Sequence, residues 1–474
     1  GLSQDKERTR SIPFSSNRKR MTTIMSDSQA YMKGAPEVVL KRCDRILLDG
    51  EVKELTEEKR KELMEETHEL ARDAYRVLAF ARKEISDPKA SKEDIEDGMI
   101  FLGLQGMMDP PRTEVKEAVE DCRTAGIDVV MATGDNMETA KAVGKELGFD
   151  TEGAVEGKEI DEMSKEELRE RVREVRIFAR VSPEHKVQIL EALQDQEFSV
   201  AMTGDGVNDA PALKDSDVGV AMGQRGTDVA KKSSDMVLQD DNFVTIRDAI
   251  AEGRHIFDNI RKVTNQLLST NSGEVMFVFL GILIGGLFFG EYFTGTNAVV
   301  LTASMILWVN FASDGPPAAA LSKDPKIKGI MEREARGKDE PIIDKKILGM
   351  IAFTGPLAAL TMLPLFFIHV ENFILAQTML FMALAFFEII MFPIIRRDYG
   401  LKMWDNKYLI GGILFATLSH MIILYTPVAK VFGVVPLSLN NWGMIGISLG
   451  IFACLELLYS GLLTKKYGSR EGGN

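Results

Sequence analysis

The sequence predicts an α/β part followed by a bundle of six membrane-spanning α-helices. Three observations predict this division. Most of the charged residues precede Lys262, six long apolar stretches follow it, and short apolar runs alternate with amphipathic helices between residues 103 and 241. The averages of 45% hydrophobic and 27% charged residues over 474 positions hide these two regimes. Such a chain is neither disordered, nor a collagen-like fibre, nor a uniformly soluble globule.

Net charge and cysteine usage exclude further classes. The net charge of −13 argues against a nucleic-acid partner, which would require a basic face. The three cysteines, Cys43, Cys122 and Cys454, are too far apart in sequence for a disulfide framework or a metal-ligand motif. Charged residues interrupt the N-terminus, so we expect no signal peptide. The chain begins with Gly1 rather than Met, and we expect that it is cut from something longer.

Residues 1–108 are expected to form a small separate unit, with a helix that ends at Cys43, a charged helix at 57–72 and a strand at 76–82. Several basic residues and one aromatic residue in this unit are suited to pairing with and stacking on a nucleotide, and a solvated basic edge is the alternative. These residues are Phe14, Arg18, Lys19, Lys33 and Arg76.

Residues 109–242 alternate strands with helices, which predicts an open parallel sheet with helices on both faces. Two loops, TGDN at 133–136 and TGDGVND at 203–209, follow strands of this sheet. Ligands bind at the carboxyl ends of such strands, and glycines let the backbone approach a phosphate. A simple turn is the alternative for the first loop. No GxGxxG or GxxxxGK[ST] motif is present, so neither dinucleotide-binding nor P-loop chemistry is indicated.

Charged side chains near these loops suit phosphate chemistry. Asp205 and Asp209 offer carboxylates to Mg²⁺, and Lys186, in the first turn of a predicted helix, could neutralise a phosphoryl charge. Residues 243–262 predict an amphipathic helix that continues into the first span. A continuous helix over 243–290 would be ~70 Å long and could link the loops to the membrane as a rod.

Six apolar stretches of about the ~20 residues that cross a bilayer follow Lys262. They cover roughly 263–290, 297–321, 347–369, 373–395, 408–426 and 441–463. Lys and Arg gather in the loops after the second and fourth stretches and in the tail. The positive-inside rule therefore places the N-terminal half and the C-terminus in the cytoplasm of a multi-pass integral membrane protein.

Polar residues inside these stretches indicate a cation pathway, because isolated intramembrane charges are costly. Carboxylate, amide and hydroxyl oxygens suit a hard cation such as Ca²⁺, and interhelical hydrogen bonding by protonated acids is the alternative. We expect Gly315-Pro316-Pro317 to break or unwind the second stretch and to free backbone carbonyls. The polar residues are Asn271, Glu274, Asn310, Ser313, Asp314 and Glu388.

The motifs MKGAPE, DPPR, TGDN, VSPEHK and TGDGVNDAPAL, in this order before six spans, resemble those of P-type cation-transporting ATPases. NSGE at 271–274 and NFASDG at 310–315 resemble calcium pumps of the sarcoplasmic-reticulum type. The resemblance implies four parts. They are the C-terminal part of a nucleotide-binding domain (1–108), a haloacid-dehalogenase-like phosphorylation domain without its nucleophile strand (109–242), a stalk helix (243–262) and a six-helix transmembrane domain (263–474).

The resemblance also implies residue roles. ATP would lie near Phe14, Lys19, Lys33, Gly34 and Arg76, with Asp109 and Arg112 at the hinge between the domains. The phosphorylation site would use Thr133, Gly134, Asp135, Lys186, Asp205, Asn208 and Asp209, with Mg²⁺ on Asp205. The transported cation, Ca²⁺, would bind Asn271, Glu274, Asn310, Ser313, Asp314 and Glu388, with protons carried in return.

One departure from the family pattern affects the expected activity. The family phosphorylates an Asp in a DKTGT motif, and the 474 residues contain no such motif. We therefore expect the acceptor before residue 1, together with the first four spans, in a missing N-terminal part of the pump. The chain alone is not expected to turn over ATP. A P-type pump for Na⁺, Mn²⁺ or H⁺ and a non-catalytic split subunit remain alternatives.

Overall fold

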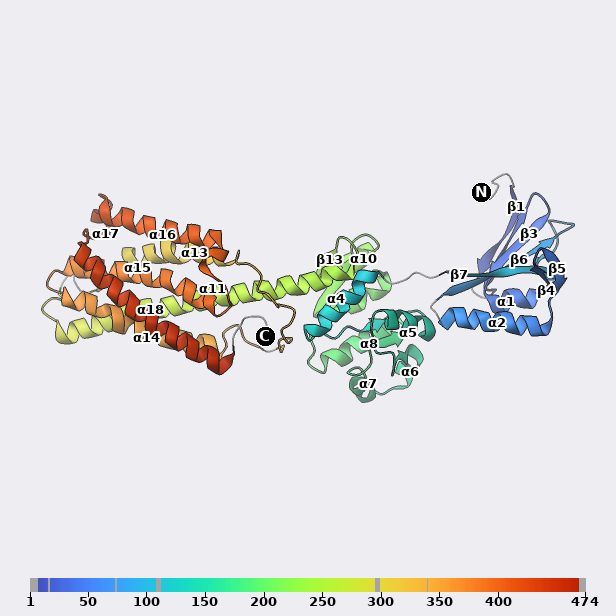
Figure 1. Ribbon diagram of the computed structural model, residues 1–474, viewed down its shortest axis with the longest axis horizontal. Coiled ribbons are helices and arrows are strands. Elements are labelled where there is room, and N and C mark those ends of the chain that lie inside the picture. Colours follow the sequence, from blue (N-terminus) through green and yellow to red (C-terminus); the bar gives the residue numbers. More distant parts are fainter. Residues whose placement is uncertain are drawn as a thin grey trace. The chain divides into compact units, whose positions relative to one another are not determined.

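The computed structural model describes residues 7–15, 18–72, 75–107, 112–294, 299–338 and 340–468, without the side chains of residues 71, 72 and 76 (Figure 1). The chain forms two compact units. The first contains Gly1–Arg123 and Asp128–Thr245, and the second contains Thr124–Ile127 and Ile246–Asn474.

The N-terminal part of the first unit is a seven-stranded sheet of order β1-β2-β3-β6-β7-β4-β5, antiparallel except for the pair β4–β7. Side chains alternate along its strands, so Met32 of β3 is buried while Lys33 is exposed. Met32, Val39, Leu63 and Phe101 form one core, which lies between the sheet and the first two helices. The elements are β1 (Arg8–Ser15), β2 (Arg20–Met25), β3 (Gln29–Gly34), α1 (Pro36–Val39), η1 (Leu40–Arg42), β4 (Cys43–Leu48), β5 (Glu51–Glu54), α2 (Glu57–Arg72), β6 (Arg76–Glu84), α3 (Lys92–Glu96) and β7 (Met99–Met107).

The following α/β part contains two three-stranded parallel sheets, of order β8-β10-β9 and β11-β12-β13. The prediction of one open sheet is therefore wrong, although every pairing is parallel as predicted. Among the described strands, β8 pairs only with β10, and β11 pairs only with β12. No described strand lies between β8 and β11 to join the two sheets into one. The strands are β8 (Met131–Ala132), β9 (Val155–Glu156), β10 (Ile177–Ala179), β11 (Ala201–Gly204), β12 (Val218–Met222) and β13 (Met236–Leu238).

Short helices connect these strands. Their N-termini carry polar caps, such as the side chain of Ser182, which accepts a hydrogen bond from the backbone N–H of His185 in the first turn of α8. The helices are α4 (Thr113–Thr124), α5 (Met137–Glu146), α6 (Gly157–Glu162), α7 (Lys165–Arg171), α8 (Pro183–Gln194), η2 (Val207–Asp209), α9 (Ala210–Asp215) and α10 (Asp228–Lys232).

The second unit is helical, and five of its described helices are long and apolar enough to cross a membrane. α11 runs without interruption for 46 residues, as the sequence predicted for this segment. Most of α15 is buried, and it contributes much of the apolar core of the unit. The five helices are α11 (Phe243–Phe288), α14 (Lys345–Ile368), α15 (Phe373–Arg397), α16 (Lys407–Tyr425) and α18 (Leu439–Tyr467), with η5 (Met403–Asp405) and α17 (Ala429–Phe432) between them.

The second predicted span is divided into α12 (Ala303–Val309), a turn of π-helix η4 (Asn310–Asp314) and α13 (Gly315–Leu321). The sequence predicted that the helix would break or unwind at Gly315-Pro316-Pro317. The structure instead shows a π-helical turn just before Gly315 and an α-helix that begins at this residue. Pro316 and Pro317 occupy the first turn of α13, where proline is tolerated. Since proline has no N–H, the carbonyls of the preceding turn still lose their usual partners. The number of six spans remains a prediction.

Candidate functional site

Asp209 organises the loop after β11. Its Oδ1 accepts a hydrogen bond from Lys186 Nζ at 2.6 Å, and its Oδ2 accepts from the backbone N–H groups of Asp205 at 3.2 Å and Gly206 at 3.1 Å. A Cβ on Gly204 would lie 2.4 Å from the Cβ of Asp209, so only glycine permits this close approach. The side chains of Asp205 and Asn208 are exposed on the same loop. The structure thus brings Lys186 to the TGDGVND loop, and its contact with a phosphoryl group stays a prediction.

The charge of Asp209 is fixed by its partners. Partial burial alone would raise the pKa of this carboxyl. The hydrogen bond and positive charge of Lys186, together with the backbone hydrogen bonds from Gly206 and Asp205, outweigh burial. They lower the pKa below its ordinary value. Asp209 is therefore ionised at neutral pH, and its bond to Lys186 is a charge-assisted hydrogen bond.

The loop after β8 is fastened to the segment that leads into α8. The N–H of Asp135 donates to Thr133 Oγ1 at 3.1 Å, and Thr133 Oγ1 lies 3.2 Å from Asp135 Oδ2. The N–H of Arg180 donates to the carbonyl of Asp135 at 2.9 Å, and that of Val181 donates to the carbonyl of Thr133 at 3.1 Å. Gly134 is exposed, and an added Cβ there would meet no atom within 4 Å. The first loop and Lys186 therefore share one supporting segment.

The predicted nucleotide residues lie on the seven-stranded sheet. Phe14 is 61% exposed on β1, beside a β-bulge between Ile12 and Ser15. Lys33 is exposed on β3, and Lys19 pairs with Glu37 at 3.6 Å. A bulge re-aims side chains, which suits a recognition surface.

Four further predicted residues are Gly34, Arg76, Asp109 and Arg112. Gly34 is buried against the backbone of Lys19, whose carbonyl accepts a bond from the N–H of Ala35 at 3.0 Å. Arg112 is exposed before α4. The side chain of Arg76 and the residue Asp109 lie outside the described part of the chain.

In the second unit, Glu274 of α11 contacts Asn310 of η4. Asn310 Nδ2 donates to Glu274 Oε1 at 2.9 Å and to Oε2 at 3.1 Å, and it also lies 3.0 Å from the carbonyl of Ile306. Asn271 lies on α11 and is half-buried. The packing of α11 against η4 thus joins two of the predicted cation ligands directly.

Five buried oxygens beside this pair have no hydrogen-bond partner among the described residues. They are Ser313 Oγ, both carboxylate oxygens of Asp314 and both of Glu388, on side chains that are at most 3% exposed. Buried polar groups are almost always paired, so these oxygens are free to hold a ligand. Oxygen ligands are those that hard cations take, and the donor set therefore fits Ca²⁺.

The ligand-bearing helices approach closely at this point. A Cβ on Gly273 would lie 2.8 Å from the Phe387 ring, so α11 and α15 are in contact beside Glu274 and Glu388. No group of three His, Cys, Asp or Glu side chains in the described ranges is arranged to hold a metal ion as it stands.

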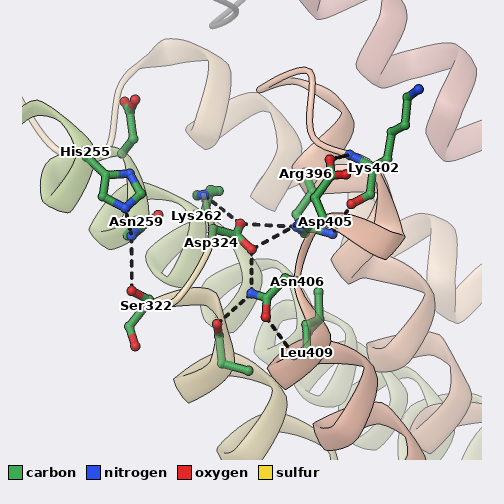
Figure 2. A network of polar contacts seen from close by, with 12 residues as sticks. His255, Asn259, Lys262, Ser322, Asp324, Arg396, Lys402, Asp405, Asn406 and Leu409 are labelled. Atoms are coloured by element: carbon green, nitrogen blue, oxygen red, sulfur yellow. Dashed lines mark hydrogen bonds and ion pairs between the residues drawn. The ribbon is translucent and has the colours of Figure 1, made fainter. Parts of the chain in front are cut away.

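Sequence reasoning missed a buried polar network in the same unit. It centres on Asp324, which lies just after α13 and contacts Lys262, Arg396 and Asn406 (Figure 2). The available signal was a lone acidic residue among the lysines that follow the second span.

Comparison with known proteins identifies the family of the chain. Residues 1–114 match the family model described as P-type ATPase, cytoplasmic domain N, and residues 298–459 match the model described as cation transporting ATPase, C-terminus. The chain is 40% identical over 467 residues to calcium-transporting ATPase 1 of Bacillus cereus, an alignment that covers 93% of this chain and 51% of that protein.

Two further relatives are similar over the same extent. The calcium-transporting ATPase of Bacillus subtilis is 39% identical over 471 residues, covering 96% of this chain and 51% of the relative. The endoplasmic reticulum calcium ATPase srcA of Aspergillus fumigatus is 34% identical over 505 residues, covering 94% and 51%. The chain thus spans about half the length of the curated relatives it matches. From the two family models and these relatives, the chain belongs to the P-type cation-transporting ATPase family.

Proposed function

We propose that the chain forms the phosphoryl-binding and cation-binding parts of an ATP-driven pump that carries Ca²⁺ across a membrane. The main support is the set of five unpartnered buried oxygens on Ser313, Asp314 and Glu388, next to the Glu274–Asn310 pair. Burying so many unpaired oxygens is costly unless a cation occupies them for part of the cycle. Ca²⁺ is proposed because the relatives are named calcium-transporting ATPases.

The loops of the α/β part are proposed to hold the phosphoryl group. Lys186 neutralises its charge, Thr133 and Asp135 line it, and Asp205 holds Mg²⁺ with Asn208 and Asp209 in support. Mg²⁺ supplies charge neutralisation during phosphoryl transfer. Asp209 fixes the position of Lys186 through the 2.6 Å bond.

The phosphoryl acceptor is proposed to be an Asp on polypeptide outside these residues. The edges of β8 and β11 support this, because each strand pairs on one side only among the described residues. A parallel strand placed between them would end between the 133–135 and 203–209 loops, since the carboxyl ends of parallel strands share one edge. ATP held near Phe14, Lys19 and Lys33 would supply the phosphoryl group.

The cation-binding carboxylates are proposed to carry protons in the return direction. After cation release, Glu274, Asp314 and Glu388 would be left as buried like charges, which favours their protonation. The predicted consequence is proton countertransport.

The cation site is tested by equilibrium binding of radioactive Ca²⁺ to the chain in lipid nanodiscs. We expect saturable binding that Asp314→Asn abolishes and that Glu456→Gln preserves. Glu456 is the matched control, because it is a fully buried carboxyl on α18 whose Oε1 accepts a hydrogen bond from Thr354 at 2.8 Å and whose Oε2, like the oxygens of Glu388, has no partner among the described residues. Absence of saturable binding, or equal loss in both variants, contradicts the site. If Mn²⁺ or Na⁺ displaces the bound radioactive Ca²⁺ at lower concentrations than unlabelled Ca²⁺ does, the choice of Ca²⁺ as the transported ion is contradicted.

The phosphoryl site is tested by adding a polypeptide that carries the DKTGT segment. With radioactive ATP and Ca²⁺, we expect a hydroxylamine-sensitive phosphoprotein only when both polypeptides are present, and none with Lys186→Met. Phosphorylation that is unaffected by Lys186→Met contradicts the role given to this lysine.

A further inference from the structure

One buried carboxylate, Asp324, connects several helices of the second unit (Figure 2). Its Oδ2 accepts hydrogen bonds from Lys262 Nζ at 2.7 Å and Arg396 Nε at 3.1 Å. Its Oδ1 accepts from Asn406 Nδ2 at 2.7 Å and lies 3.1 Å from Arg396 Nη2. We call Asp324, Lys262, Arg396 and Asn406 the Asp324 network.

The Asp324 network is almost completely removed from solvent. Lys262 and Arg396 are 0% exposed, Asn406 is 2% exposed and Asp324 is 3% exposed. Burying charges costs several kcal/mol for each ion before pairing recovers it, so such a network is weak evidence for stability alone. Its better-attested use is to specify one geometry among alternatives.

The three charged members are on the same chain segments that carry the candidate cation ligands. Lys262 precedes Glu274 by about three turns of α11, and Arg396 follows Glu388 by about two turns of α15. Asp324 follows the end of α13, and its N–H donates to the carbonyl of Leu321 at 3.1 Å. α13 in turn follows η4 directly.

The network also holds the end of α13 from a second side. Asn406 Nδ2 donates to the carbonyl of Ala320 at 2.8 Å as well as to Asp324. The Oδ1 of Asn406 accepts a bond from the N–H of Leu409 and so caps α16. The last turn of α13 is therefore fixed by a backbone contact and by a charge contact.

From this arrangement we infer that Asp324 is a positioning residue for the cation site and holds the three ligand-bearing segments in register. The inference rests on the proposed cation-binding function. Neutralising Asp324 leaves Lys262 and Arg396 without their shared partner, so α11 and α15 are no longer tied to α13. Glu274, Asp314 and Glu388 then lose their relative positions without any direct change to a ligand.

The same unit offers a matched control, because a second buried ion pair joins different helices. Lys346 of α14 donates to Asp398, just after α15, and Thr464 of α18 donates to Asp398 at 3.0 Å. The side chains of Lys346 and Asp398 are 7% and 12% exposed. Neither α14 nor α18 carries a predicted ligand, so Asp398→Asn removes a comparable charge contact at the end of α15 without removing a contact between two ligand-bearing segments.

The experiment compares Asp324→Asn with Asp398→Asn in the full chain in nanodiscs, by Ca²⁺ binding and by hydrogen exchange. Loss of a group that supports metal ligands typically weakens binding about 10- to 100-fold. We expect this loss for Asp324→Asn and less than about threefold for Asp398→Asn at a similar fall in Tm. Adding Lys262→Met to Asp324→Asn removes one unpaired charge and should recover part of the Tm but not the affinity.

Hydrogen exchange gives a measure that does not depend on cation binding. We expect Asp324→Asn to speed exchange of the backbone amides of η4 and α13, and Asp398→Asn to leave them unchanged. Equal effects of both variants, or no effect of Asp324→Asn, overturn the positioning role. If the unmodified chain binds no Ca²⁺, the proposed function fails, whereas the exchange data still show whether Asp324 fixes η4.

Discussion

The Lys186–Asp209 pair allows a quantitative test in the phosphoryl-binding loop. Asp209→Asn keeps the size of the side chain but removes the charge that accepts from Lys186 at 2.6 Å and from the backbone N–H groups of Asp205 and Gly206. Hydrogen bonds to charged groups contribute about 1.5–3 kcal/mol, and loss of one partner from a buried ion pair costs about 3–5 kcal/mol. Asp209 is buried, but Lys186 is partly exposed, so we expect about 2–3 kcal/mol.

The pH dependence has a definite sign. The pKa of Asp209 is lowered in the folded chain, where Lys186 and backbone donors outweigh partial burial. Its unfolded value is about 3.9. The stabilisation is therefore complete above that value and is lost as the pH falls through the folded pKa. Below about pH 4 the stability of the original chain should approach that of Asp209→Asn.

Hydrogen exchange of the Asp205 and Gly206 amides in the full chain measures this effect locally. A loss of 2–3 kcal/mol corresponds to ~30- to 150-fold weaker protection at pH 7, at 1.36 kcal/mol for each factor of ten. Asp150→Asn serves as the control, because Asp150 makes a similar side-chain bond to the N–H of Glu152 at 2.9 Å in an exposed turn. Unchanged protection of the loop in Asp209→Asn, or a difference that grows on acidification, would refute the reasoning.

Three further predictions concern other parts of the chain. Gly273→Ala should push α11 from Phe387 and weaken Ca²⁺ binding at least tenfold, whereas Gly253→Ala on the same helix meets no atom within 4 Å and should leave binding unchanged. Burial raises the pKa of Cys43 to about 12, so alkylation at pH 8 should require unfolding, and rapid labelling of the folded chain contradicts this. Glu96→Gln should destabilise the β1–β2 hairpin by about 2–4 kcal/mol, measured by its amide exchange, because this buried carboxyl accepts charged and hydroxyl donors.

The polar residues of the membrane helices were predictable because the signal is local. Glu274 and Glu388 interrupt apolar runs, and a charge in such a place requires a special reason. The i, i+4 spacing of Asn310 and Asp314 placed both in one short segment, which the structure shows as η4. What the spacing could not supply was the direct contact between Asn310 and Glu274, which depends on how two helices pack.

The organisation of the α/β part was only half predictable. Strand positions and their parallel pairing follow from local apolar runs and connecting helices. Which strand pairs with which is decided by contacts far apart in the sequence, so β8 and β11 could not be assigned to separate sheets from their own residues. The pairing of Lys186 with Asp209 was predictable only in part, because both residues follow predicted strands, whereas the structure places these strands, β10 and β11, in different sheets.

The Asp324 network could not be predicted for a different reason. Lys and Arg near the ends of apolar helices normally reach water with their long side chains. Nothing in the local sequence distinguishes Lys262 and Arg396 from such residues, although both are fully buried. Both are buried because they contact Asp324, which lies on a different segment of the chain. The residue pattern of a single helix carries no information about such a contact.

The π-turn at Asn310–Asp314 has a consequence for insertions and deletions. A π-helical turn holds one more residue than an α-helical turn, so everything beyond it is rotated by about 100° relative to an unbroken α-helix. Deleting a single residue from this turn would let the helix close to the α form and swing α13 around its axis by that angle. Asp324 would then leave Lys262 and Arg396, although neither lies near the deletion in the sequence. An indel scan of the second span should therefore find this turn far less tolerant than its length suggests.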